Sequence, residues 1–208
     1  NYLSILRDTS FWKSLGRTFL YLICTVTGEV GIGFFIAYVF NRKMKGMRYL
    51  RTLILVPMAI TPVVAGMFWK VMYNTSYGPI NYFLSLIGMK GPAWIASDRT
   101  AFWSVLIVNI WQWMPFSFLT ITAGFHSMPN DVYEAAKIDG AGNLQTLRYV
   151  TIPMMKQVLL TLVLLRAIEA MKAYDLVYVM TSGGPGEVTQ LLPFYIYTKG
   201  FTWFDFGY

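Results

Sequence analysis

The sequence is poor in the residue types that build disulfides and metal sites. Its 208 residues include one cysteine, Cys24, and one histidine, His126. A single cysteine excludes an internal disulfide, and two isolated ligands are too few for a metal site. We therefore expect no bound metal, and we interpret Cys24 as a small buried hydrophobe.

Charged residues are also scarce, at 13% of the chain, which is about half the share found in a typical soluble domain. Hydrophobic residues reach 56% and aromatic residues 17%, including seven tryptophans. Tryptophan is enriched where membrane proteins meet the two membrane interfaces. The composition argues against a soluble core and predicts an all-α, polytopic membrane protein.

No catalytic constellation is visible. The histidine has no plausible nucleophile partner, and the acidic residues are scattered or spaced with bases. The chain lacks a Gly-x-x-x-x-Gly-Lys-Ser/Thr phosphate loop, so we expect no ATP hydrolysis by the chain itself. No inverted repeat, typical of many secondary transporters, is evident. We predict no catalytic residue and no cofactor in this chain, and we keep a polytopic membrane enzyme and an ion-gradient-driven transporter as alternatives.

Four apolar stretches are long enough to cross a bilayer, which takes about 20 residues for roughly 30 Å of hydrocarbon. They run over residues 15–40, 50–73, 101–125 and 152–181. We predict a bundle of these four helices in a single domain, residues 1–208. Pro57 and Pro62 indicate an irregular second helix. In the first helix, three glycines around Glu29 indicate close helix packing with one buried acid.

The charges of the loops predict the orientation. Segment 41–51 holds five basic residues and no acid, whereas the longer loop 74–100 holds two basic residues. The positive-inside rule places 41–51 in the cytoplasm and 74–100 outside. Alternation then places 126–151 in the cytoplasm and 182–208 outside.

Between the last two spans lies a polar helical hairpin, residues 129–150. Asp131 and Glu134 resemble a capping box at its first helix, and Asn143 can cap a second helix. Gly140 and Gly142 break the helix between them. A plain connection needs only a few residues, yet about 25 are used here. The segment is therefore a candidate docking element for a soluble partner.

A DNA-binding helix-turn-helix is the rival interpretation of this hairpin. Residues 131–147 carry one base, Lys137, against Asp131, Glu134 and Asp139. Phosphate binding requires a basic footprint, so we expect no nucleic-acid partner.

The hairpin also resembles a family signature. Glu134-Ala135-Ala136, then Gly140, then Val150-Thr151-Ile152-Pro153 resembles the EAA motif of permease subunits of binding-protein-dependent ABC importers. The family pattern ends Ile-x-Leu-Pro, so this chain differs conservatively at two positions. Stretches 111–116, 174–181 and 183–185 resemble the carbohydrate-uptake branch, the relatives of maltose and glycerol-phosphate permeases.

The resemblance implies a fold and a set of partners. The fold would be the type I ABC importer permease, with the hairpin as a cytoplasmic coupling helix that contacts an ATPase through Glu134, Ala135, Ala136, Asp139 and Gly140. The partners would be a second, different permease subunit, two ATPase subunits that bind ATP and Mg, and an extracytoplasmic solute-binding protein. The chain would lie in a bacterial or archaeal plasma (inner) membrane. Family permeases commonly have six or more spans, so we expect one further helix at each end.

Polar residues inside the spans are the candidates for a substrate path. Arg166, Glu169, Lys172 and Asp175 recur every three residues and alternate in sign. Unpaired charges at membrane depth cost about 2.5 kcal/mol or more each, so the row is either a self-neutralising ladder or a contact surface for a polar solute. In the third span, Asn109, Gln112 and Trp113 share a helix face and either bond between helices or contact solute. Together these observations predict a transmembrane subunit of an ATP-driven importer for a sugar, oligosaccharide or related polar solute.

Overall fold

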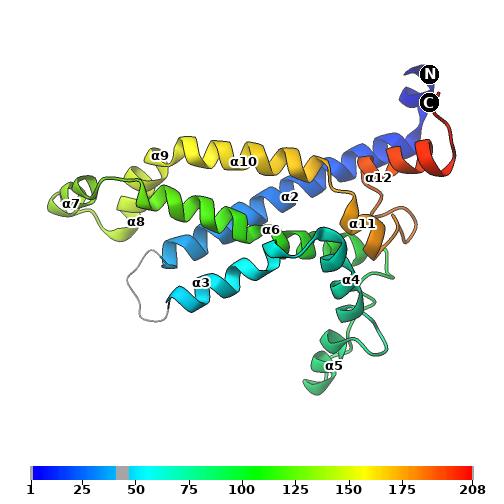
Figure 1. Ribbon diagram of the computed structural model, residues 1–208, viewed down its shortest axis with the longest axis horizontal. Helices are drawn as coiled ribbons and strands as arrows, with labels where there is room; N and C mark the ends of the chain where they lie inside the picture. The colour runs from blue at the N-terminus through cyan, green and yellow to red at the C-terminus, as the bar shows by residue number, and fades with distance from the viewer. Residues whose placement is uncertain (1, 41–46, 208) are drawn as a thin grey trace.

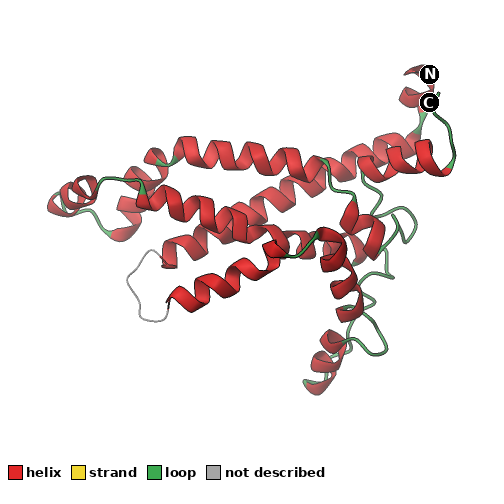
Figure 2. Cartoon of the chain, in the orientation of Figure 1, coloured by secondary structure: helices red, strands yellow, loops and turns green. Residues whose placement is uncertain are grey.

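The computed structural model describes residues 2–40 and 47–207, and every regular element within these ranges is a helix (Figures 1 and 2). The expected all-α fold is therefore confirmed. Residues 41–46 of the basic segment predicted at 41–51 lie outside the described residues. The helices are α1 (Tyr2–Arg7), α2 (Thr9–Phe40), α3 (Met47–Leu55), η1 (Val56–Ala59), α4 (Pro62–Met72), α5 (Pro79–Leu86), α6 (Ala101–His126), α7 (Asn130–Ile138), α8 (Asn143–Thr146), η2 (Leu147–Thr151), α9 (Ile152–Met154), α10 (Lys156–Met171), α11 (Asp175–Met180), α12 (Leu192–Tyr197) and η3 (Thr198–Thr202).

Helices α2 and α6, of 32 and 26 residues, are each long and apolar enough to cross a membrane. They correspond to the predicted spans 15–40 and 101–125. Helix α2 begins six residues earlier than expected because Asp8 caps it: the Ser10 amide donates to the Asp8 carboxylate at 2.8 Å. A capped start satisfies a backbone donor that would otherwise lack a partner, so the helix extends to the cap.

The two long helices pack closely because α2 presents glycine where they cross. A Cβ at Gly33 would lie 2.8 Å from the Cβ of Ser117 on α6, and one at Gly28 would lie 2.5 Å from Ile110. Small residues at a crossing let helix backbones approach within a membrane, where packing drives association. Near the crossing, α10 joins them in a buried cluster of Ala37, Phe118, Ile121, Phe125, Met155 and Leu162.

The predicted second span, 50–73, is not one straight helix. Helix α3 and the 3₁₀ turn η1 are bent by 100° from α4, with Ile60 and Thr61 in extended conformation at the break. Pro62 has no amide hydrogen and disfavours a helical conformation in the residue before it, so the helix ends there and a new one begins. This is the irregularity that the proline pattern indicates.

The predicted fourth span, 152–181, is divided in a similar way. Its middle is the 16-residue helix α10, which is bent by 68° from the segment Asn143–Met154. Helix α10 ends at Met171. The next helix, α11, packs against α4, where a Cβ at Gly66 would lie 3.2 Å from Val179. A continuous helix over 152–181 is therefore wrong, because α11 turns to fill the space beside the bent second span.

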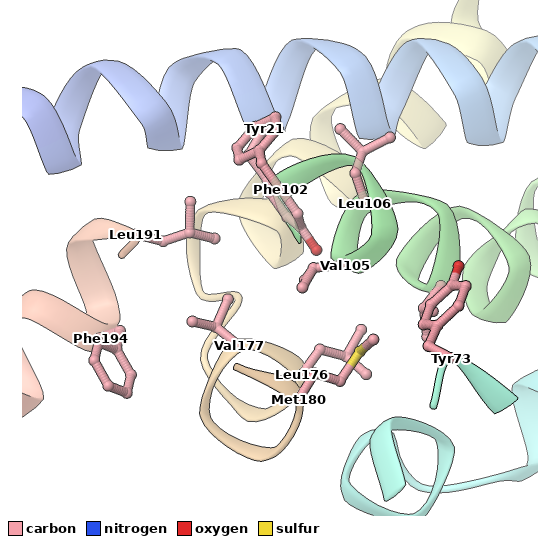
Figure 3. Packing of buried hydrophobic residues seen from close by; sticks show 11 residues of the cluster. Tyr21, Tyr73, Phe102, Val105, Leu106, Leu176, Val177, Met180, Leu191 and Phe194 are labelled. Atoms are coloured by element: carbon pink, nitrogen blue, oxygen red, sulfur yellow. The ribbon is translucent and has the colours of Figure 1, made fainter. Parts of the chain in front are cut away.

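A second buried cluster joins α11 and α12 to the first half of α2 and of α6. The cluster contains Val177 and Met180 of α11, Leu191, and Phe194 of α12, together with Tyr21 and side chains of α6 (Figure 3). Polar bonds reinforce the contact, since the Leu192 amide donates to the Thr18 hydroxyl on α2 at 2.8 Å. The chain after α10 is thus an integral part of the bundle.

The polar segments are divided between the two ends of the molecule. The end of α2, the start of α3 and the hairpin helices α7 and α8 lie at one end, while α12 and both termini lie at the other (Figure 1). The predicted topology requires segments 41–51 and 126–151 on one side and 182–208 on the other. The described residues 47–51, 126–151 and 182–207 are arranged in this way (Figure 1), and the orientation in the membrane stays a prediction.

We expect Gly33→Leu to destabilise the bundle by about 1–3 kcal/mol, because the larger side chain overlaps the α6 backbone. The measurement is equilibrium unfolding of the purified protein in mixed micelles. Gly31→Leu is the matched control, since a Cβ there meets nothing within 4 Å. Equal stability of the two variants would contradict the close approach at Gly33.

Candidate functional site: a buried ion pair, a polar cavity and a terminal hairpin

A buried ion pair joins α2 to α10. The Arg166 Nε lies 2.6 Å from Glu29 Oε2, and its Nη2 lies 3.2 Å from Glu29 Oε1. Both side chains are shielded, with 3% and 0% of their surfaces exposed. The Asn109 amide of α6 donates to Glu29 Oε1 at 2.9 Å. One carboxylate thus binds polar groups from both neighbouring helices, which lowers the cost of burying charge.

The cation of this pair also contacts an aromatic ring. The guanidinium carbon of Arg166 lies 4.6 Å from the centroid of the Trp113 ring on α6. An arginine over a tryptophan face is attracted by the negative charge of the ring, more strongly when water is excluded. Glu29, Asn109, Trp113 and Arg166 therefore form one connected polar group inside the bundle.

A cavity of about 90 Å³ opens beside this group. Five of the six predicted substrate-path residues line it, namely Asn109, Trp113, Glu169, Lys172 and Asp175. The other lining residues include Pro62, Arg166 and Tyr174. The breaks after α10 and before α4 bring these residues together, because each break places side chains from two directions at the same point.

Gln112, the sixth predicted path residue, has another contact. Its amide donates to the Ile60 carbonyl at 2.8 Å, at the bend between η1 and α4. Pro62 leaves carbonyl groups at that bend without their usual helical partner. Gln112 is thus the interhelical hydrogen bond that the sequence offered as the alternative to solute contact.

The self-neutralising ladder exists only in part. Glu169 pairs with Lys172 at 2.6 Å, but both side chains are more than half exposed. Arg166 pairs across the bundle with Glu29 instead of with Glu169. Sequence spacing identifies partners along one helix but gives no sign of a partner 137 residues away. The lone acid among glycines in the first span was the available signal for Glu29.

The hairpin is built by one glycine conformation. Helix α7 ends at Ile138, and Gly140 then adopts φ +77°, a left-handed conformation that favours glycine. The Ala141 amide donates back to the Ala136 carbonyl at 2.9 Å, which closes the helix end. The expected turn at Gly140 is therefore present.

The caps of the hairpin differ from the sequence interpretation. Helix α7 starts after Pro129, and Asp131 lies within its first turn, where no side chain caps the helix. The Asp131–Glu134 capping box is therefore wrong. A capping bond is found instead in the second arm, where the backbone amide of Gly142, just before α8, donates to Gln145 Oε1 at 2.9 Å. Asn143 is the first helical residue of α8 and does not cap it.

The predicted coupling residues lie on the outside of the hairpin, with one exception. Glu134, Ala135, Asp139 and Gly140 are exposed, while Ala136 is buried on the side of α7 that packs against η2. Three large apolar side chains are also highly exposed on the hairpin: Ile138, Leu144 and Tyr149. Apolar side chains held out on a polar segment are typical of a surface that another protein covers.

The chain matches the family described as "Binding-protein-dependent transport system inner membrane component" over residues 29–202. The chain belongs to this family. The resemblance based on the EAA motif is thereby confirmed, and the chain is a membrane permease subunit and not itself an enzyme. Membership decides against the membrane enzyme and the ion-gradient transporter.

Relatives of this permease have names that indicate sugar transport. It is 36% identical to the trehalose/maltose transport system permease protein MalF of Thermococcus litoralis, over all of this chain and 70% of the relative. It is 32% identical to the sulfoquinovosyl glycerol transport system permease protein SmoG of Agrobacterium fabrum, over all of this chain and 68% of the relative.

The permease also has the fold of a solved transporter. A crystal structure of a bacterial ABC transporter that imports the acidic polysaccharide alginate superposes with a TM-score of 0.88. The match covers 99% of this chain and 73% of the other, at 18% identity. At that identity the likeness concerns the fold alone, and it confirms the importer-permease architecture.

We expect Arg166→Leu to lower the free energy of unfolding by about 3–5 kcal/mol, because it leaves Glu29 buried without its cation. The double variant Glu29→Leu/Arg166→Leu removes both charges and should regain most of that loss. Equilibrium unfolding in mixed micelles measures both. The control Lys172→Ala breaks an exposed pair and should cost less than about 1 kcal/mol. A double variant as unstable as Arg166→Leu would contradict this account.

Proposed function

We propose that this permease forms part of the translocation path of an ATP-driven importer for a sugar, an oligosaccharide or a related polar solute. The observation that carries the proposal is the polar cavity, in which Asn109 and Trp113 of α6 meet Lys172 and Asp175 from the segment that follows α10. Amide and carboxylate groups bond hydroxyls, and an aromatic ring packs against the apolar face of a sugar ring. The names of two relatives, the trehalose/maltose and the sulfoquinovosyl glycerol permeases, support the same substrate class.

Each wall of the cavity has a distinct role in this proposal. Trp113 is fixed by Arg166, so its ring is held at a constant position. Glu169, Lys172 and Asp175 are exposed and supply polar groups of both signs. With Arg166 the lining carries two charges of each sign. A wall with balanced charges suits a hydroxyl-rich solute, since neither a cation nor an anion is excluded by net repulsion.

The hairpin is the proposed contact with a separate ATPase. Glu134, Ala135, Asp139 and Gly140 are available on its outer side, and the small alanine and glycine residues permit close approach of a partner. Ala136 is buried, and α7 packs against η2, which leads on toward the bundle. The segment continues through η2 and α9 into α10, so a displacement of the hairpin acts directly on the helix that carries Arg166.

The proposed assembly contains two ATPase subunits that bind ATP and Mg, a second and different permease subunit, and an extracytoplasmic solute-binding protein. A structure of the alginate transporter in complex with its oligosaccharide-bound periplasmic protein supports the last partner. The hairpin and residues 47–51 would face the cytoplasm of a cell with this transporter in its inner membrane. Closure of the ATPases would rotate the helices between inward-facing and outward-facing states.

The coupling role predicts an uncoupled transporter when the hairpin is altered. Glu134→Lys reverses an exposed charge, and Gly140→Pro cannot adopt φ +77°. We expect each to reduce ATP-dependent uptake in reconstituted vesicles at least tenfold without preventing membrane insertion. Gly88→Pro is the matched control, because Gly88 has φ +76° in the loop 74–100 far from the hairpin. Normal uptake in both hairpin variants would refute the coupling role.

The cavity predicts a substrate effect that is separate from coupling. Asp175→Ala removes an acceptor from the wall, and we expect about tenfold weaker uptake, equivalent to one lost charge-assisted hydrogen bond. ATPase activity stimulated by the binding protein should persist. Asp98→Ala, which removes an exposed acid away from this cavity, is the control. Unchanged uptake in Asp175→Ala would remove this residue from the path.

A further inference from the structure

A second polar cavity lies between the hairpin and the end of the bundle, with a volume of about 320 Å³. Tyr38 of α2 and Phe125 of α6 form its bundle side, and Tyr133 and Lys137 of α7 form part of its hairpin side. Helices α7 and α8 extend beyond the ends of the long helices at this end of the molecule (Figure 1). The substrate path does not include this cavity.

Each of the polar side chains that line this cavity can donate a hydrogen bond. They include the Lys137 ammonium, the Asn143 amide and the hydroxyls of Tyr133, Thr146 and Thr151. No carboxylate lies among the residues that line it, and Lys137 makes no ion pair within the described part of the chain. Donors and one cation without an acid form a site for an anion with several acceptor oxygens, such as a phosphate.

The hydroxyls are only loosely engaged by the protein. The Tyr133 hydroxyl donates to Met128 Sδ and accepts from Thr151 Oγ1, each at 3.5 Å. The distance between the two hydroxyl oxygens is at the long end for a hydrogen bond, so a charged acceptor would replace that contact without loss. Thr151 itself is buried, which fixes its hydroxyl at the base of the cavity.

The level of the cavity along the bundle favours a lipid headgroup as the source of the phosphate. Tyr38 lies two residues before the end of α2 at Phe40, and Phe125 is next to the last residue of α6. Helix ends mark the level where apolar spans meet polar segments, which is where headgroups lie. Basic pockets between helices on the cytoplasmic side are suited to anionic headgroups, and Phe125 and Leu147 offer apolar surface for the glycerol.

We propose that this cavity binds the phosphate-bearing headgroup of an anionic phospholipid, with Lys137 as its charge partner. The bound headgroup bridges α7 to the ends of α2 and α6 and holds the hairpin against the bundle. Membrane composition thereby sets how firmly the hairpin follows the bundle. This inference rests on the proposed function only through the cytoplasmic position of the hairpin.

The test is native mass spectrometry of the purified, assembled transporter with added phosphatidylglycerol, with phosphatidylcholine, or with inorganic phosphate. We expect retained phosphatidylglycerol, little phosphatidylcholine, and no displacement by millimolar phosphate. Lys137→Gln should weaken phosphatidylglycerol retention about tenfold, because a charge-assisted bond is lost. Lys156→Gln is the matched control, since Lys156 is an exposed base at the same end of the bundle but outside the cavity.

Thr146→Val provides a second test, because it removes one donor with little change in volume. It should weaken retention by a smaller factor than Lys137→Gln. Three results would overturn the lipid site. They are retention of phosphatidylglycerol in Lys137→Gln and Thr146→Val equal to that of the unaltered protein, a loss in Lys156→Gln equal to that in Lys137→Gln, and displacement of the lipid by free phosphate. Protection of Lys137 from chemical labelling by the ATPase alone, in lipid-free detergent, would also overturn it, since that result assigns the cavity to the protein partner. ATP-dependent uptake by the same preparations tests the proposed function separately.

Discussion

The bond between Glu29 and Arg166 is the constraint on which the rest of the bundle depends. It joins two helices that are far apart in the sequence, and Asn109 adds the third. Inside a bilayer an unpaired charge is not hydrated by water. The three helices must therefore stay in register for both charges to remain paired. The same pair holds Trp113 in place and so sets one wall of the polar cavity.

The breaks in the helices build the site that the ion pair supports. A straight second span would carry Pro62 past the cavity, and a straight fourth span would carry Asp175 and Tyr174 away from it. The bend of 100° before α4 and the break after α10 bring these segments together. Gln112 bonds the Ile60 carbonyl at the first break, which compensates a backbone group that proline leaves without its helical partner. Irregular backbone is thus tolerated where it lines a polar space.

The hairpin at the far end is the segment to which we assign the proposed coupling role. Its turn depends on the left-handed backbone of Gly140, its inner side on Ala136, and its continuation on the bent passage into α10. The proposed lipid cavity beneath it and the ATPase contact on its outer side would act on the same short helix. Under the proposed coupling role, a force applied there would reach the polar cavity through α10, which carries Arg166 in the core and Glu169 at the cavity wall.

The sequence by itself determined the helical class, the membrane character, the long helices α2 and α6, the turn at Gly140 and the family. These follow from hydrophobic length, from glycine and proline chemistry and from one motif, all of which are local properties. It also named five residues of the cavity, because polar groups in apolar helices stand out. Only the tertiary structure decided that Arg166 pairs with Glu29 rather than with Glu169, that Gln112 bonds a backbone carbonyl, and that α11 folds against α4. Those partners lie far apart in the chain, and packing, unlike local spacing, selects among all the partners that a charge or amide could reach.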